Sequence, residues 1–120
     1  MTTHQIYVAG PMTGIPEFNF PAFNAAASKL RAAGHSVFNP AERDIERHGG
    51  VDISKGNVSG CQDHAAKEHG FSLRDALADD CEWICHTADA IAMLPGWENS
   101  KGARAEWALA HALGHRVIYL

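Results

Sequence analysis

The chain has 120 residues, of which 46% are hydrophobic and 20% charged, and its formal net charge at pH 7 is -4. This length and composition predict one small globular domain over residues 1–120 and exclude a multidomain or disordered protein. The acidic balance argues against nucleic-acid binding, which usually needs clustered Lys and Arg. No apolar run approaches the roughly 18 residues of a membrane span, and residues 1–5 lack the basic start of a signal peptide. We therefore expect a cytoplasmic protein without membrane partners.

Strands and helices alternate along the chain. Short β-rich runs predict strands at 5–9, 35–38, 89–94 and 116–120, and apolar periodicity with capping and stop signals predicts helices at about 20–33, 73–86 and 101–113. Residues 41–71 show no sustained period and predict a long surface loop or insertion with one short helical turn. The alternation predicts an α/β fold, a Rossmann- or flavodoxin-like three-layer sandwich around a parallel sheet of about four to five strands.

The sheet fixes where a ligand would bind before any motif is named. In open parallel sheets, ligands bind beyond the carboxyl ends of the strands. Here those ends are residues 10–14, 39–40 and 95–97.

The last predicted helix carries a carboxylate in an unusual position. At about 100° per residue, Glu106 lies on the edge of an apolar stripe, and Arg104, Trp107 and His111 point the other way. The stripe itself is predicted to consist of Ala105, Leu109, Ala112 and Leu113. Glu106 is then either partly desolvated or a surface residue whose head turns to water.

The start of the same helix suits an anion. Ser100 is placed to cap the helix, and Gly102 leaves the first turn without a blocking side chain. Free backbone N–H groups and the positive end of the helix dipole favour a phosphate there. The alternative is an ordinary cap with a glycine for close packing.

A second carboxylate points inward from the helix at 73–86. Asp80 falls on the apolar side of that helix, whereas Asp79 falls on the outer side. Two inward carboxylates beside one strand are either a buried acid with a polar partner or an acid and nucleophile pair that cleaves glycosidic bonds. Tyr7 either supplies a phenol to one of them or fills the core.

These motifs together resemble the nucleoside 2-deoxyribosyltransferase superfamily, and in particular its small bacterial and phage members. The resemblance covers nearly the whole chain apart from residues 43–71. It rests on Tyr7-Val8-Ala9-Gly10-Pro11-Met12, on Asp80 with Trp83 before Ala88-Asp89-Ala90, and on Ser100-Lys101-Gly102-Ala103-Arg104-Ala105-Glu106.

The resemblance implies roles for individual residues. Glu106 matches the nucleophile that forms a covalent glycosyl-enzyme, Tyr7 the residue that positions it, and Asp80 the acid that protonates the leaving base. Ser100 matches the phosphate-binding Ser of the 2-deoxynucleoside 5-phosphate N-hydrolases, where transferases on free nucleosides have Asp. Further ligand-binding positions are Gly10, Pro11, Met12, Gly96, Trp97 and Gly102; the hydrolases carry a polar or basic residue where this chain has Pro11 and Met12.

The resulting hypothesis is an N-glycosidase of (2-deoxy)nucleoside 5-monophosphates, acting without cofactor. Base exchange between nucleosides and a non-catalytic nucleotide-binding module stay open as alternatives. A cytokinin-type phosphoribohydrolase fits less well, because it needs a Gly-Gly turn and a Thr before the Glu. The resemblance also implies a homo-oligomer, a dimer or larger, and an exposed Trp107 beside His111 and Arg104 is typical of a subunit interface.

The cysteines and histidines predict no metal site. Cys61, Cys81 and Cys85 are odd in number and are expected to be reduced thiols. His48, Cys61, His64 and His69 do not match a zinc spacing, and they are expected in a solvated or lid-like loop.

Overall fold

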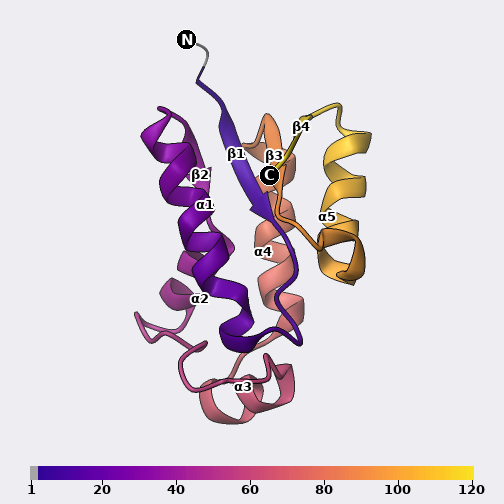
Figure 1. Ribbon diagram of the computed structural model, residues 1–120. Coiled ribbons are helices and arrows are strands. Elements are labelled where there is room, and N and C mark those ends of the chain that lie inside the picture. The colour runs from indigo at the N-terminus through magenta and orange to yellow at the C-terminus, as the bar shows by residue number, and fades with distance from the viewer. Residues whose placement is uncertain (1–2) are drawn as a thin grey trace.

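The computed structural model describes residues 3–120, apart from the side chains of Asp63, His64, Glu68 and His69. The described chain forms a four-stranded parallel sheet in the order β2-β1-β3-β4 (Figure 1). The strands are β1 (Gln5–Ala9), β2 (Ser36–Phe38), β3 (Ala90–Met93) and β4 (Arg116–Tyr119). The predicted α/β fold with a parallel sheet is thus confirmed.

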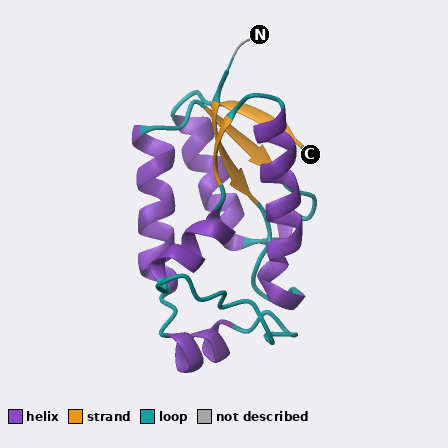
Figure 2. Cartoon of the chain, turned by 90° about the vertical axis from the view of Figure 1, so that its left-hand side faces the viewer, coloured by secondary structure: helices purple, strands orange, loops and turns teal. Residues whose placement is uncertain are grey.

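Helices cover both faces of the sheet (Figure 2). They are α1 (Phe20–Ala32), α2 (Pro40–Arg47), α3 (Gln62–His69), α4 (Leu73–His86) and α5 (Lys101–Ala112). Two single-turn 3-10 helices, Pro16–Asn19 and Trp97–Asn99, follow β1 and β3. Within residues 3–120, no helix is both long and apolar enough to cross a membrane.

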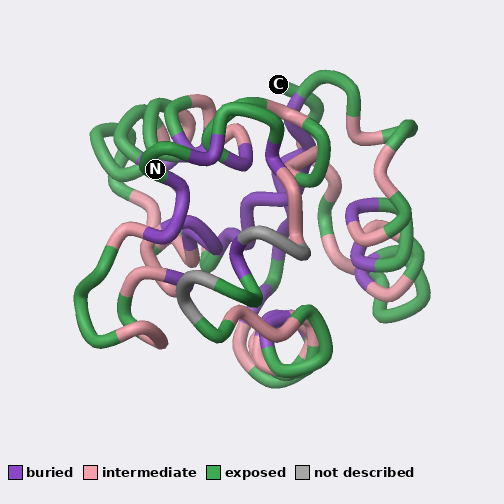
Figure 3. Tube along the Cα trace, turned by 90° about the horizontal axis from the view of Figure 1, so that it is seen from below, coloured by how far each residue is buried: buried purple, intermediate pink, exposed green. Residues whose placement is uncertain are grey.

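The two central strands are buried on both faces, as expected for a covered parallel sheet. On β1, Tyr7 faces the core cluster under α4 and α5, whereas Val8 faces the cluster under α1. Figure 3 shows the buried residues along the centre of the trace and the exposed ones along its outer turns. The strand order reverses between β1 and β3, because β2 lies beyond β1 and β4 beyond β3. This is the switch point at which open sheets bind ligands.

The prediction of a loop over residues 41–71 was wrong in its helix content. Two eight-residue helices, α2 and α3, lie in this segment and fold below the carboxyl ends of the strands (Figure 1). Asn39 caps α2 by accepting a hydrogen bond from the backbone N–H of Ala41 at 3.0 Å, and Pro40 occupies the first turn. The helix has eight residues, and those it buries are Pro40, Ala41 and the acidic Asp44, so its apolar pattern is too short to predict a helix from the sequence.

The segment is fastened to the loop that follows β1. The backbone N–H of Gly14 donates to the carbonyl of Gly60 at 2.9 Å, and that of Glu17 donates to Asn57 at 2.9 Å. Gly60 has φ +65, and a Cβ there would lie 2.2 Å from the carbonyl oxygen of Ile15. Only glycine allows this approach. Residues 57–60 therefore hold the loop after β1 in place, and we call this contact the clamp.

Candidate active site

The loops after β1 and β3 meet at the switch point, as the sequence predicts. A Cβ on Gly10 would lie 2.7 Å from the Cβ of Leu94, and a Cβ on Gly96 would lie 3.4 Å from the Cγ of Pro11. The carbonyl of Pro11 accepts a hydrogen bond from the Asn19 side chain at 3.0 Å. Met12 is half-buried against the core cluster under α1. The two glycines thus keep the loops in contact.

Glu106 lies at the centre of the buried face of α5, not at its edge. The buried residues of this helix are Ala103, Glu106 and Ala110, whereas Ala105, Ala112 and Leu113 are exposed. The predicted core stripe was therefore wrong in phase. The helix packs on α4 and β3 through small residues. The predicted stripe included the large apolar residue Leu113, but Leu113 lies in the turn that ends the helix and does not belong to its buried face.

Tyr7 and Glu106 form a direct pair. The Tyr7 hydroxyl donates a hydrogen bond to Oε2 of Glu106 at 2.6 Å, a short distance typical of a charge-assisted bond. The Tyr7 ring is held on its other side by Phe38 at 5.4 Å between centroids, and Phe38 packs on Trp83 at 5.1 Å. This aromatic stack holds the Tyr7 ring in place, and the Tyr7 hydroxyl in turn orients the Glu106 carboxylate.

Asp80 is the second buried carboxyl, and α4 places it as predicted. Ala76, Asp80 and Ile84 form the buried face of that helix. Oδ1 of Asp80 is buried and has no hydrogen-bond partner among the described residues. A buried acceptor without a partner is costly unless it is protonated or receives a donor from a ligand. Oδ1 of Asp80 is therefore available to bind or release a proton.

Burial raises the pKa of both carboxyls. The pKa of Glu106 rises to about 8 through burial, against the hydrogen bond from Tyr7, and that of Asp80 rises to about 7 through burial, against the charge of Arg47. The pKa of Tyr7 lies well above its usual value because of burial and the neighbouring Glu106. Both carboxyls therefore gain or lose a proton near neutral pH, and each raises the proton affinity of the other because their charges repel.

Arg47 and Asp44, both from α2, belong to this site although the sequence analysis gave them no role. Arg47 pairs with Asp44, donates to Oδ2 of Asp79 at 2.6 Å and lies 3.8 Å from Oδ1 of Asp80. Burial raises the pKa of Asp44, and the hydrogen bond from Arg43 lowers that of Asp79. The signal that could have found Arg47 is the alternation of acidic and basic residues over 42–47.

The start of α5 has the predicted open geometry. The Ser100 hydroxyl accepts from the backbone N–H of Ala103 at 3.2 Å, which confirms the cap. A Cβ on Gly102 would meet only that hydroxyl, at 4.0 Å. Glu106 lies one turn further along the same helix. The first turn of α5 is therefore open around Gly102.

The aromatic residues near α5 differ from prediction. Trp107 is half-buried, not exposed: it stacks on Trp97 at 5.6 Å and on His111 at 5.1 Å, and its indole N–H donates to the Tyr119 hydroxyl at 3.2 Å. Trp97, predicted to bind substrate, thus lies against α5. His111 and Arg104 are exposed.

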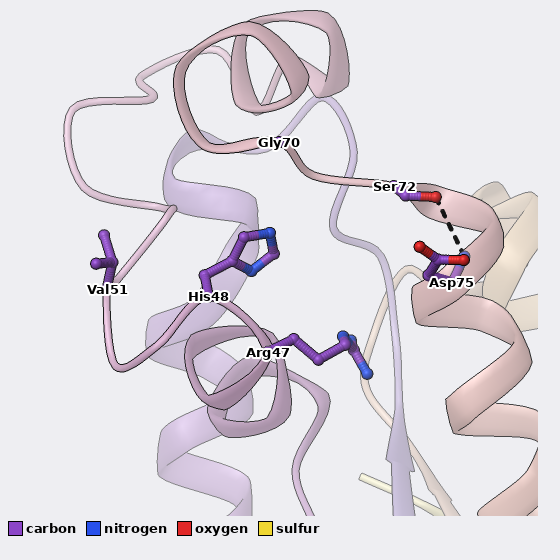
Figure 4. Close-up of a pocket in the computed structure, with 6 residues that line it drawn as sticks. All are labelled: Arg47, His48, Val51, Gly70, Ser72 and Asp75. Carbon is purple, nitrogen blue, oxygen red and sulfur yellow. Dashed lines mark hydrogen bonds between the residues drawn. The ribbon is translucent and has the colours of Figure 1, made fainter.

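Two open clefts flank the α2 side of the site. One has a volume of about 490 Å³ and is lined by Arg47, His48, Val51, Gly70, Ser72 and Asp75 (Figure 4). The other has about 330 Å³ and includes Arg43, Asp79 and Trp83. Glu106 and Tyr7 line neither cleft. Arg47 points from the first cleft toward α4 (Figure 4), and its guanidinium lies 3.8 Å from Oδ1 of Asp80 on that helix.

The cysteines and histidines singled out in the sequence take up the following positions in the described part of the structure. Cys61, Cys81 and Cys85 are all free thiols. His48 makes a 2.7 Å contact between Nδ1 and the carbonyl of Asp44. The side chains of His64 and His69 lie outside the described part of the structure.

Comparison with known proteins places the chain in a family. No curated protein matches the sequence. A family model described as a domain of unknown function, DUF4406, matches residues 4–119, which is nearly the whole chain. The chain therefore belongs to the DUF4406 family.

Proposed function

We propose that this protein is an N-glycosidase that cleaves the base–sugar bond of 2-deoxynucleoside 5-monophosphates through a covalent glycosyl intermediate on Glu106. The observation that carries the proposal is the 2.6 Å hydrogen bond from Tyr7 to Glu106 in a buried site that also holds the unpartnered Oδ1 of Asp80. One carboxyl is oriented by a donor, and the other has an oxygen available for a proton. This is the division of labour that a retaining glycosidase needs.

The reaction follows from those two roles. The Glu106 carboxylate attacks the anomeric carbon, the bond to the base breaks with its electron pair on the base, and the base nitrogen takes the proton of Asp80. Water then attacks the anomeric carbon and gives its proton to Asp80, and Glu106 leaves as a carboxylate. Each step moves one proton to or from Asp80, and the hydrogen bond from Tyr7 supports this assignment because it favours the ionised form of Glu106.

The start of α5 supports a phosphorylated substrate. The Ser100 hydroxyl, the positive end of the helix dipole and the open space at Gly102 favour a 5-phosphate. Gly10, Pro11, Met12 and Gly96 would lie around the same end of the sheet, since their loops are in contact. No cofactor is required for this chemistry.

Base release tests the proposal directly. The purified protein is incubated with a panel of 2-deoxynucleoside and nucleoside 5-monophosphates, and free base is separated by chromatography. We expect release by the wild type and by Glu98→Gln, which changes an exposed carboxyl, and loss of release in Glu106→Gln. A protein mass increased by one sugar phosphate would mark the intermediate. Undiminished release by Glu106→Gln would overturn the proposal.

The same assay separates hydrolysis from base exchange. A free acceptor base is added, and its incorporation into nucleotide is compared with the release of sugar phosphate. Hydrolysis predicts no incorporation. Tight binding of nucleotides with no release and no exchange would instead favour a binding module.

We also propose that the protein acts in the cytoplasm as a homo-oligomer, a dimer or larger, without nucleic-acid or membrane partners. Three free thiols support a reducing compartment. The exposed Leu113, Tyr119 and Leu120 lie on or beside α5 and β4 and support a subunit contact there. Light scattering on the wild type and on Tyr119→Lys checks the contact: the variant should shift to a smaller species.

A further inference from the structure

Arg47 reaches the carboxyl pair from a segment that the enzymatic proposal does not use. It ends α2, and its side chain is only 16% exposed. Its guanidinium pairs with Asp44 on its own helix, donates to Asp79 on α4 at 2.6 Å, and lies 3.8 Å from Oδ1 of Asp80. One cation is thus held among three carboxylates.

The contact with Asp80 acts through charge and not through a hydrogen bond. At 3.8 Å the separation is too long for a hydrogen bond, but a unit charge at that distance acts strongly in a partly buried site. Asp80 has a side chain that is 10% exposed, and its Oδ1 has no other partner. Its protonation must therefore respond to the guanidinium.

The other groups that face Asp80 are carboxyls, which disfavour its ionised form, and one phenol, which carries no positive charge. They are Asp44 from α2, Glu106 from α5, Asp79 on its own helix and the Tyr7 phenol from β1. The three carboxyls favour a protonated Asp80, whereas the phenol can stabilise its ionised form. Arg47 is the cation that the described residues place against Asp80.

We propose that Arg47 is a positioning residue that sets the protonation of Asp80 and so enables it to act as both acid and base. This inference rests on the proposed glycosidase function. Without the guanidinium, three neighbouring carboxyls would keep Asp80 protonated, and it could give a proton to the base but not take one from water. A catalytic group works best with its pKa near the working pH.

The planar guanidinium group of Arg47, a fork of two N–H-bearing nitrogens, holds the positive charge in a fixed place beside Asp80. Arg47 uses one nitrogen for Asp79 and another for Asp44, and these two bonds fix the guanidinium at its distance from Asp80. A lysine ammonium has a point charge and cannot make the same pair of bonds in one orientation. Charge alone would keep part of the effect, and the fork supplies the rest.

Arg43 provides a matched control on the same helix. It lies one turn before Arg47 and donates to the same Oδ2 of Asp79, also at 2.6 Å, from Nε. Its side chain is 40% exposed, and its other ion pair is with Glu46 at 3.1 Å. Among the described contacts it has none with Asp80. Removing Arg43 therefore removes a charge and an Asp79 contact without removing the charge beside Asp80.

The decisive measurement is a titration of the Asp80 carboxyl carbon by NMR in aspartate-labelled protein, with Asp80→Asn to assign the signal. Arg47→Gln should raise the apparent pKa of Asp80 by about one pH unit or more, Arg47→Lys by less, and Arg43→Gln by a few tenths at most. In turnover, Arg47→Gln should move the alkaline limb of the pH profile upward and lower kcat more than it changes KM.

The outcomes separate this inference from the function on which it rests. An Asp80 titration that is the same in wild type and folded Arg47→Gln overturns the role of Arg47, whether or not base is released. Absence of base release by the wild type overturns the glycosidase function instead. Should Arg47→Gln fail to fold, Arg47→Met replaces it, because methionine keeps the apolar part of the side chain without the charge; an Asp80 titration in Arg47→Met equal to that of the wild type would overturn the role of Arg47.

Discussion

The Tyr7 hydroxyl and Oε2 of Glu106 lie 2.6 Å apart although 99 residues separate them in the chain. The contact joins the centre of β1 to the buried face of α5. The hydrogen bond holds both side chains in one orientation before any substrate arrives. Groups that are oriented in advance stabilise a charge that develops in the transition state.

Tyr7→Phe tests the contribution of this hydrogen bond. Loss of a hydrogen bond to a charged group costs about 1.5–3 kcal/mol, so we expect kcat for base release to fall about 10- to 100-fold. The ring remains, and its stacking on Phe38 should keep the fold intact. Tyr119→Phe removes the other tyrosine hydroxyl, which is exposed, and should leave kcat unchanged. Equal rates for wild type and Tyr7→Phe would show that the phenol only fills the core.

Ser100→Asp tests the phosphate site. Aspartate caps a helix as well as serine does, so the stability of α5 should be kept. The new carboxylate would repel a 5-phosphate, and KM for monophosphates should rise about tenfold or more, equal to about 1.4 kcal/mol. The matching nucleosides serve as the internal control, because they carry no phosphate. A variant whose KM for monophosphates stays at the wild-type value would place the phosphate elsewhere.

The raised pKa values predict how stability depends on pH. Burial lifts Asp80 from 3.8 to about 7 and Glu106 from 4.5 to about 8, so the folded protein binds more protons than the unfolded chain between those limits. This contribution to stability is fully present below about pH 4 and is lost as pH rises through 7 to 8. The slope is up to about 1.4 kcal/mol per pH unit for each proton.

Urea unfolding at pH 5.5 and pH 8.5 measures this effect. The wild type should be less stable at the higher pH, and Glu106→Gln should reduce the difference because it removes one of the two groups. Glu98→Gln changes an exposed carboxyl and should keep the wild-type difference. Equal stability of the wild type at both pH values would mean that the carboxyls are not desolvated as described.

Gly60→Ala tests the clamp between residues 57–60 and the loop after β1. Alanine at φ +65 is strained, and its Cβ would lie 2.2 Å from the carbonyl oxygen of Ile15, so unfolding should become easier by about 2–5 kcal/mol. Gly14→Ala is the control, since it has φ +85 and nothing within 4 Å of the added Cβ. It should cost about 1 kcal/mol. Similar melting temperatures for the two variants would contradict the close approach.

Local sequence patterns were enough to predict the sheet, three helices and the inward position of Asp80. These follow from patterns of two or 3.6 residues, which local backbone geometry imposes wherever an apolar face is buried. The sequence also placed Ser100 as a cap, because capping depends on a few neighbouring residues. The helical pattern also drew attention to Glu106, and the resemblance to a known family then implied roles for Glu106 and Tyr7.

The surroundings of those residues depend on how the helices pack, which local patterns do not specify. The phase of α5 depends on packing against α4 and the sheet, so Glu106 is central to the buried face although the apolar pattern put it at the edge. The helix α2 has only eight residues and buries an acidic one among them, so its apolar pattern was too short to predict it. Arg47 matters because three carboxylates converge on it from two helices. The charged residues over 42–47 could indicate ion pairs, but which carboxylates of α4 meet Arg47 is settled only when the two helices pack together.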